Sequence, residues 1–463
     1  MSDNASSKRF CIIGAGACGI AAVKNFKERG IPFDCFEQEA DIGGIWNPDC
    51  DRAVYETTHL NTSKRLSRYT DFPMPEAYPQ FLSRSQALDY VRAYARHFGL
   101  YDHITFNTRV ETVAEVDGRW QVTLSGEDGP RLYDGVVIAN GHHWDPKWPD
   151  YPGEFTGEVL HAYQVKKRDQ LRGKRVLVVG AGNTGCDLAA DAALSAREIT
   201  HSMRRTYYFL PKFAFGRPLD LMIDLTSRWP LPRALLRRLW AGALYVLVGP
   251  YEKYGLPKPD HKLMESHPTS ASSYLDHLAH GRIAPKPEIA ELKGDRVRFT
   301  DGSEVEVDLV IYATGYHISF PFMDRDYFLT EDGGSRLFLH IFHRRLDTLF
   351  TVGLVQPADG GFWQLADYQG QLIANFIVAQ ERDPAKADWF RKLKATTTPD
   401  VSHGVTYLDS QRHKHEVAHY RYRTYMKRLI AKFGPVAEAS FPAQQADEPA
   451  QTESSRESLQ LAS

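Results

Sequence analysis

Two segments of the chain share one pattern of hydrophobic and polar positions. Residues 10–13 and 176–179 are short runs of large apolar side chains, typical of strands that are buried on both faces. Each run leads into a glycine-rich turn, and an alanine-rich stretch with helical character follows each turn. Strand, turn and helix in this order are the start of a βαβ unit, so the chain is predicted to contain two such units.

Both turns have the spacing Gly-x-Gly-x-x-Gly. In this setting the first glycine permits a tight turn, the second lets the backbone approach a pyrophosphate, and the third brings helix and strand together. One such match can also mark an ordinary tight turn, but two predict that a single polypeptide binds two dinucleotides. The turns consist of Gly14, Ala15, Gly16, Ala17, Cys18 and Gly19, and of Gly180, Ala181, Gly182, Asn183, Thr184 and Gly185.

The rest of the pattern predicts an α/β fold with two Rossmann-like dinucleotide-binding domains, the second inserted in the first. The first domain is expected over residues 1–154 and again over 311–436, and the second over 155–310. The apolar run within 308–316 is expected to return the chain to the first domain. Further strands are expected at 31–36, 105–113, 120–124, 136–141 and 198–203, helices at 85–97 and 363–381, and a hairpin at 297–300 and 304–307.

Residues 213–255 form a helical insert of unusual composition. Its centre, 235–249, mixes Leu, Trp, Tyr and Val with the pair Arg237 and Arg238. Two interpretations stay open: a buried helical hairpin, or a partly exposed amphipathic element that gates a substrate channel or touches a membrane or partner surface. Residues 437–463 are rich in Ala, Gln, Glu, Ser and Pro and are expected to form a disordered tail.

Composition and charge narrow the class of protein. The 463 residues are 43% hydrophobic and 25% charged with a net charge of −2, which does not indicate binding to nucleic acid. The five cysteines include no Cys-x-x-Cys pair, which favours a reducing compartment. The N-terminus is polar, and no apolar run approaches the ~18 residues of a membrane span. We therefore expect a cytoplasmic protein, and the sequence is compatible with a homodimer.

Residues after the second strand of each domain distinguish the two nucleotides. Glu37 ends that strand in the first domain, about 20 residues after the first glycine, where a carboxylate binds ribose hydroxyls. In the second domain, Ser202, Arg204 and Arg205 stand there without an acid. Because arginine binds a 2′-phosphate that an acid would repel, we assign FAD to the first turn and NADPH to the second. Solvated surface charges are the alternative interpretation of Arg204 and Arg205.

Seven further motifs lie between the first turn and Ile373. With them the chain resembles the flavin-containing monooxygenases, the class B family that also includes Baeyer–Villiger enzymes. The resemblance covers most of the folded part. The motifs are Asp-Ile-Gly-Gly-Ile-Trp at 41–46, Asn-Thr-Ser-Lys at 61–64, Asp-Phe-Pro at 71–73, Gly-His-His at 141–143, His-Pro-Thr at 267–269, Ala-Thr-Gly-Tyr at 313–316 and Gly-Leu-Val-Gln at 353–356.

The motif that identifies this family, Phe-x-Gly-x-x-x-His, runs from Phe155 to His161. The family has an aromatic residue four positions after the histidine, but this chain has Val165 there and Tyr163 two positions after it. Baeyer–Villiger enzymes have Trp followed by Pro or Asp, whereas Lys166 follows here. This difference argues against a dedicated ketone oxygenase without excluding ketone activity. His161 is expected either to position the linker or to be structural.

The resemblance implies an NADPH- and O2-dependent flavoprotein monooxygenase similar to N,N-dimethylaniline monooxygenases. NADPH would reduce FAD, and O2 would form a C4a-hydroperoxyflavin that oxygenates a soft nucleophile such as a thioether, an amine or indole. For this chemistry the protein mainly has to position the reacting groups and to exclude water. The partners implied are a small nucleophilic substrate and O2, with no metal. Baeyer–Villiger oxygenation and a non-oxygenating FAD/NADPH redox protein are the alternatives, whereas a disulfide reductase would need a redox-active cysteine pair.

The resemblance also implies roles for single residues. Asn61 would contact the flavin C4a edge and is the candidate catalytic residue, with an Asx turn as the alternative. Asn183 and Thr184 would lie under the NADPH pyrophosphate and nicotinamide ribose, or would be helix-start residues only. Trp46 would pack near the flavin or be an ordinary core residue. The other candidate FAD contacts are Gly44, Ile45, Thr62 and Val110.

Overall fold

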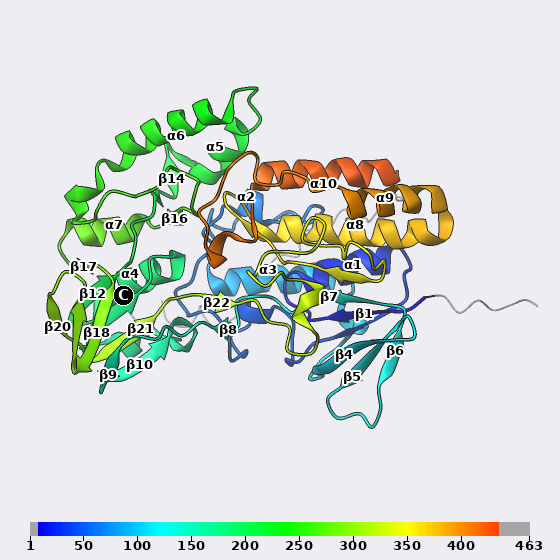
Figure 1. The fold of residues 1–463 in the computed structure, drawn as a ribbon, viewed down its shortest axis with the longest axis horizontal. Helices are drawn as coiled ribbons and strands as arrows, with labels where there is room; N and C mark the ends of the chain where they lie inside the picture. The colour runs from blue at the N-terminus through cyan, green and yellow to red at the C-terminus, as the bar shows by residue number, and fades with distance from the viewer. Residues whose placement is uncertain (1–7, 435–463) are drawn as a thin grey trace, which may run out of the picture.

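The computed structural model describes residues 8–434, which form two halves, each built around a five-stranded sheet (Figure 1). All neighbouring strands in both sheets run parallel. The central strands are buried along their length, as parallel sheets covered by helices require. This is the α/β fold with two Rossmann-like domains that the sequence predicts. In spatial order the strands are β23 (Leu349–Thr351), β7 (Gly135–Ile138), β1 (Phe10–Ile13), β2 (Phe33–Phe36) and β3 (Ile104–Thr105), and β10 (Glu158–His161), β21 (Leu309–Tyr312), β11 (Arg175–Val179), β12 (Glu198–Ser202) and β17 (Ala284–Lys286).

Helices cover both sheets. Helix α1 follows the first glycine turn and packs against α8, which also contacts α9 and α10. Helix α4 follows the second turn and packs against α7. Helix α3 starts with a capping box between Ser83 and Gln86. The helices are α1 (Gly19–Glu28), α2 (Lys64–Ser67), α3 (Arg84–His97), α4 (Asn183–Ser195), α5 (Leu219–Thr226), α6 (Arg233–Val248), α7 (Ser272–Ala279), α8 (Phe362–Arg382), α9 (Pro384–Thr396) and α10 (His419–Phe433).

Shorter strands form small sheets around the two halves. The predicted hairpin at 297–300 and 304–307 is confirmed as β19 and β20. The strand expected over 105–113 is instead divided into β3 and β4, because the chain turns between them at Asn107, whose φ is 54°. These strands are β4 (Val110–Val116), β5 (Arg119–Leu124), β6 (Arg131–Tyr133), β8 (Asp145–Pro146), β9 (Gly153–Phe155), β13 (Phe209–Leu210), β14 (Phe213–Ala214), β15 (Arg217–Pro218), β16 (Thr269–Ser270), β18 (Ile289–Gly294), β19 (Arg296–Phe299), β20 (Glu304–Glu306), β22 (Tyr316–His317), β24 (Gln356–Pro357) and β25 (Glu416–Val417).

The apolar run within 308–316 does not return the chain to the first sheet, so that expectation is wrong. The run forms β21, which lies between β10 and β11 in the second sheet, with Val310 opposite Val159 and Leu177. A buried strand is apolar on both faces whichever sheet it joins, so its sequence does not predict which strands it pairs with. The first sheet is completed by β23, a three-residue strand too short to show a period.

The insert at 213–255 is not a buried hairpin, so that interpretation is wrong. Within α6, Leu236 and Leu244 are buried, whereas Tyr245 is 64% and Val246 83% exposed. The amphipathic, partly exposed interpretation fits this geometry. Within residues 8–434, no helix is both long and apolar enough to cross a membrane. The tail predicted at 437–463 lies outside the described residues.

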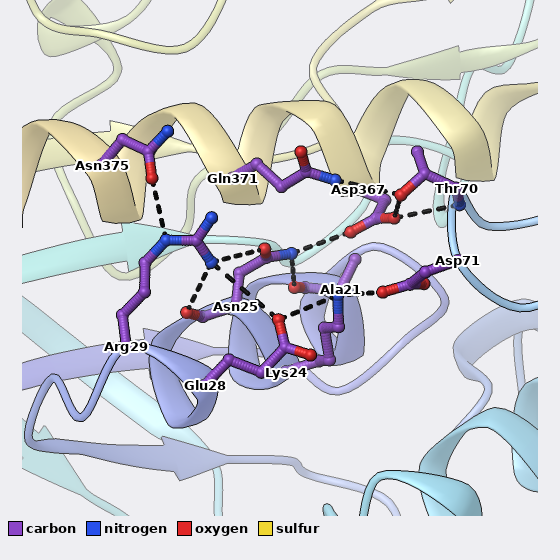
Figure 2. A network of polar contacts seen from close by, with 10 residues as sticks. All are labelled: Ala21, Lys24, Asn25, Glu28, Arg29, Thr70, Asp71, Asp367, Gln371 and Asn375. Atoms are coloured by element: carbon purple, nitrogen blue, oxygen red, sulfur yellow. Dashed lines mark hydrogen bonds and ion pairs between the residues drawn. The ribbon is translucent and has the colours of Figure 1, made fainter. Parts of the chain in front are cut away.

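A buried network of polar side chains joins α1, α8 and the loop after α2 (Figure 2). Asp367, on α8, accepts hydrogen bonds from the Asn25 amide at 2.8 Å and from the Thr70 backbone N–H at 3.0 Å. Asp367 is fully buried, so these donors replace the water that its carboxylate has lost. Gln371 donates to the Thr70 hydroxyl at 3.0 Å. The network holds the loop against the helix that follows the first glycine turn.

A cation completes this network from the side of α1. Lys24, with 4% of its side chain exposed, forms ion pairs with Asp71 and with Glu28, the latter at 3.0 Å. A buried ammonium group is tolerated only with such partners. Lys24 therefore fixes Asp71, the first residue of the Asp-Phe-Pro motif, against α1 (Figure 2).

We expect Asp367→Ala to lower the free energy of unfolding by about 3 kcal/mol, because Asn25 and Thr70 lose their buried acceptor. Urea unfolding followed by circular dichroism measures the change. Glu381→Ala, at an exposed position of the same helix, is the control. A loss no larger than that of the control, about 0.5 kcal/mol, would show that the network does not stabilise the fold.

Candidate functional site

The first glycine turn joins β1 to α1 at the carboxyl edge of the first sheet. Gly14 has a φ of +98°, and a Cβ on it would lie 2.7 Å from the Ala139 carbonyl oxygen. A Cβ on Gly19 would overlap the Gly14 carbonyl. A Cβ on Gly16, in contrast, would meet only ordinary contacts, 3.7 Å from the Gly44 Cα. Packing within the protein requires Gly14 and Gly19 but would tolerate a Cβ at Gly16, so the glycine there fits the close approach of a bound pyrophosphate.

Glu37 directly follows β2 and faces this turn. Its carboxylate accepts hydrogen bonds from the backbone N–H of Ala15 at 2.6 Å and of Glu39 at 3.0 Å. Burial raises the pKa of Glu37, and the two N–H donors oppose that rise. Thr108 N–H donates to the Glu37 carbonyl at 2.9 Å, which brings Val110, at the start of β4, into this region. The structure thus brings Ala15, Glu37 and the start of β4 together.

A short turn, Gly44–Trp46, covers the first glycine turn. Gly16 pairs with Gly43 in an isolated bridge, so the two glycine segments touch. Gly44, with a φ of +56°, begins the 3-10 turn that contains Ile45. The Trp46 ring packs edge-on against Trp363 at 5.9 Å and is only partly buried. Trp46 is therefore a core contact that keeps one part of its ring accessible.

Asn61 is exposed and forms no hydrogen bond within residues 8–434. An Asx turn would bond its side chain to Ser63 N–H, but that N–H donates to Asp220, on α5, at 2.6 Å. The neighbouring Thr62 hydroxyl is engaged with Ser67 at 2.7 Å. The Asn61 amide is thus the polar group of this motif that is available to a ligand.

The second glycine turn repeats the geometry of the first. Gly180 has a φ of +111°, and a Cβ on it would lie 2.5 Å from the Ala313 carbonyl oxygen. A Cβ on Gly185 would overlap the Gly180 carbonyl, whereas the Cβ position of Gly182 is open except for Arg412, whose nearest nitrogen lies at 3.8 Å. The residues present therefore fit a second dinucleotide.

Segment 267–269 contacts and stabilises this turn, a role that we did not predict from the sequence. Thr269 donates to the Ala181 carbonyl at 3.2 Å. Asn183, the first residue of α4, accepts from Ser270 N–H at 2.9 Å, so its side chain is already paired in the structure. Thr184 lies next to it in the first turn of α4. The motif was visible in the sequence, but only the folded chain shows which segment it contacts.

The candidate residues at the end of β12 and just after it differ in their surroundings. Ser202 is buried and donates to the Pro287 carbonyl at 2.7 Å, so its hydroxyl already has a partner. Arg204 is 80% exposed and lies 3.9 Å from Glu288. Arg205 is 38% exposed and bonds Asp260 at 3.0 Å. Both guanidinium groups can therefore reach an anionic ligand at the end of β12.

The linker histidine is held in its neutral form. Burial lowers the pKa of His161 to about 4, although the Gly315 carbonyl, 3.1 Å from its Nε2, opposes the shift. Val165, where the family has an aromatic residue, is 1% exposed in the core of the second half. The Tyr163 ring instead forms a cation–π contact with Arg52, whose guanidinium carbon lies 4.2 Å from the ring centroid. His161 thus has the contacts of a structural residue in this conformation.

A family model described as "Flavin-binding monooxygenase-like" matches residues 7–437 of the chain. The chain belongs to this family. Flavin-containing monooxygenase 5 of Rattus norvegicus is 33% identical to it over 432 residues, 88% of this chain and 80% of the relative. Flavin-containing monooxygenase 2 of Homo sapiens is 33% identical over 390 residues, 79% of this chain and 72% of the relative. The resemblance found in the motifs is confirmed, and the protein is a flavin monooxygenase.

Solved structures share the fold. Tmm from Pelagibacter sp. strain HTCC7211 aligns with a TM-score of 0.65 at 18% identity, over 92% of this chain and 86% of the other. A structure titled "Crystal Structure of OTEMO complex with FAD and NADP (form 1)" aligns with a TM-score of 0.66 at 18% identity, over 92% and 98% of the two chains. Two-domain flavoprotein monooxygenases therefore share this architecture.

Asp187, one turn into α4, links the second half to the segment before Asn61. Tyr55 donates to its carboxylate at 3.4 Å. Burial raises the pKa of Asp187 to about 6, with Lys212 opposing the shift. The unfolded-state pKa of an aspartate is about 3.9, so deprotonation favours the unfolded chain. The stability associated with the protonated carboxyl is lost as the pH rises between those two values.

We expect Asp187→Asn to remove this pH dependence. Relative to the wild type, its free energy of unfolding should rise by about 1 kcal/mol more at pH 8 than at pH 5, because the amide carries no charge at either pH. Urea unfolding at both pH values measures the difference, with Asp102→Asn at an exposed position as the control. The same offset at both pH values would show that Asp187 titrates as in the unfolded chain.

Proposed function

We propose that this protein is an FAD-containing, NADPH- and O2-dependent monooxygenase that oxygenates soft nucleophiles at sulfur or nitrogen. The observation that carries the proposal is that packing requires the outer glycines of both turns but would tolerate a Cβ at Gly16 and Gly182, the positions at which a pyrophosphate would approach the backbone. Each turn lies at a helix N-terminus, which favours a pyrophosphate. Membership of a flavin-binding monooxygenase family supports a redox function for this pair of candidate sites.

FAD would be held at the first turn, where Glu37 binds its ribose hydroxyls and Gly44 allows close approach. When bound, the flavin would supply electron transfer and activation of O2. Residues of the chain would form the surroundings of the flavin. Trp46 and Trp363 pack edge-on against each other beside the turn and would shield this side of the flavin from water.

NADPH would be held at the second turn, with Arg204 and Arg205 at its 2′-phosphate. Their present partners are weak, because exposed ion pairs contribute about 0–1 kcal/mol and exchange readily for a phosphate. Asn183 and Thr184, in the first turn of α4, would lie at the pyrophosphate and the nicotinamide ribose. Ser202 would support the strand end rather than the ligand, since its hydroxyl is bound to Pro287.

Asn61 would make the catalytic contact. Its amide has no partner among residues 8–434, while Asp220 and Ser67 fix the residues on its C-terminal side. A neutral amide donates a hydrogen bond at the reacting edge of the flavin without supplying an acidic proton. The residue would therefore orient the reacting oxygen and leave proton chemistry to the cofactor.

A cavity of about 180 Å³ between α5, α6 and the segment 402–407 is the candidate substrate pocket. Leu219 and Ile223, which line it, lie on α5 together with Asp220, whose carboxylate accepts a hydrogen bond from the Ser63 N–H of the Asn61 motif. The mostly apolar lining suits small apolar molecules that carry a sulfur or amine nitrogen. A cytoplasmic location, a homodimer and contact of 213–255 with a membrane surface stay predictions from the sequence.

A substrate panel tests this function. Methyl phenyl sulfide, trimethylamine, indole and a cyclic ketone would each be added to the FAD-loaded protein with NADPH and O2. A sulfoxide or N-oxide that accounts for the NADPH consumed supports the proposal. A lactone as the main product would favour the Baeyer–Villiger alternative, and H2O2 alone would favour a redox protein without oxygenase activity.

We expect Asn61→Ala and Asn61→Asp to keep FAD binding and flavin reduction by NADPH but to lose oxygenation. Both variants remove the amide donor, and Asn61→Asp does so with almost no change in size, so product yield should fall about 100-fold. Anaerobic reduction at the flavin absorbance band and the ratio of product to H2O2 in air measure the two steps. Unchanged product yield in both variants would remove Asn61 from the mechanism.

We expect the double variant Arg204→Ala and Arg205→Ala to raise KM for NADPH by more than tenfold while that for NADH changes little. Each charge-assisted contact to the 2′-phosphate contributes about 1.5–3 kcal/mol, and NADH lacks that phosphate. Arg197→Ala, which removes an exposed arginine paired with Glu198, is the matched control. Equal changes for both nucleotides would contradict the 2′-phosphate assignment.

A further inference from the structure

Arg412 reaches the second glycine turn from a distant part of the chain. It lies in the 3-10 turn Gln411–His413, just before β25, which pairs with β24 outside the second sheet. Its two terminal guanidinium nitrogens lie 3.8 and 3.9 Å from the Cβ position of Gly182. Gly182, at which a pyrophosphate would approach the backbone, is therefore faced by a cation that the second sheet does not itself supply.

The position of Arg412 is fixed on both sides. Gln411 donates to the Asp332 carbonyl at 2.8 Å, and the buried His413 ring contacts the Ser266 hydroxyl at 3.1 Å. The Arg412 guanidinium carbon stacks over the Tyr207 ring at 4.6 Å. These contacts order the side chain before any ligand binds, which lowers the entropy lost on binding.

The charge of Arg412 has no counter-charge in the structure. Within residues 8–434, it forms no ion pair and no hydrogen bond, whereas Arg205 and Arg423 are paired with Asp260 and Asp224. The first turn of α4 carries no acidic residue and no side-chain cap, so its N–H groups add positive potential at the same place. An ordered cation beside a helix N-terminus is unfavourable until an anion lies between them.

We propose that Arg412 is a further binding residue for the nicotinamide dinucleotide and donates to its pyrophosphate. The inference rests on the proposed function, because it requires a dinucleotide at the second turn. Pyrophosphate is common to NADPH and NADH, so Arg412 contributes affinity without discriminating between them, unlike Arg204 and Arg205. The C-terminal segment and the second domain then hold the nucleotide together, which retains the oxidised form after reduction of the flavin.

The experiment measures binding rather than turnover. The FAD-loaded wild type and Arg412→Ala would be titrated with NADP+ and with NAD+ by isothermal calorimetry. The variant should weaken both by about 10- to 100-fold, the factor expected for a charge-assisted contact, with the ratio of the two dissociation constants unchanged. Arg412→Lys should recover part of the affinity, since it keeps the charge but loses the bidentate geometry. Arg428→Ala, at an exposed position of α10, should bind as the wild type does.

Three results would overturn the inference. Wild-type affinity in Arg412→Ala would show that the residue does not contact the nucleotide, and weaker binding of NADP+ alone would place it at the 2′-phosphate. If Arg412→Ala loses FAD through misfolding, Arg412→Lys decides, because unchanged binding in that variant at full FAD content would exclude the bidentate contact. A wild type that binds neither nucleotide would instead contradict the proposed function itself.

Discussion

The close backbone contact between strand and helix at each glycine turn is the constraint on which the rest of the structure depends. A Cβ at Gly19 or Gly185 would overlap a carbonyl of the same turn, so α1 and α4 can start where they do only with glycine at these positions. That contact places each helix N-terminus at the carboxyl edge of its sheet, beside Gly16 or Gly182, where packing would tolerate a Cβ. Two turns of the same design, each suited to an anion, thereby arise in one chain.

The segment that carries Asn61 has no sheet of its own and is positioned by polar side chains from elsewhere. Asp220 of the insert holds Ser63, and Asp367 of α8 holds Thr70. Tyr55, before the motif, donates to Asp187 on α4. Contacts from both halves therefore converge on the segment that carries the candidate catalytic residue. A substitution in α8 or α4 is expected to act on the chemistry through position rather than through charge at the flavin.

The C-terminal segment closes the molecule around the second site. Burial raises the pKa of Glu416, but His267 and His413 outweigh that effect and hold the pKa at about 2. His267 belongs to the segment that contacts the second turn, so this ionised carboxylate binds the C-terminal segment to the second half. Arg412 lies four residues before Glu416. The same segment that joins the halves thus presents the cation proposed to bind the nucleotide.

The sequence by itself determined the features that depend on neighbouring residues. The two glycine turns, the strands before them, helix α8 and the β19–β20 hairpin follow from local dihedral limits and periodicity. The tertiary structure decided what depends on distant partners: that β21 joins the second sheet, that β23 completes the first, that the insert exposes Tyr245 and Val246, and that Thr269 and Arg412 meet the second turn. A buried strand or a lone arginine has the same local pattern whichever segment it contacts, because the partner is chosen by packing across the whole chain.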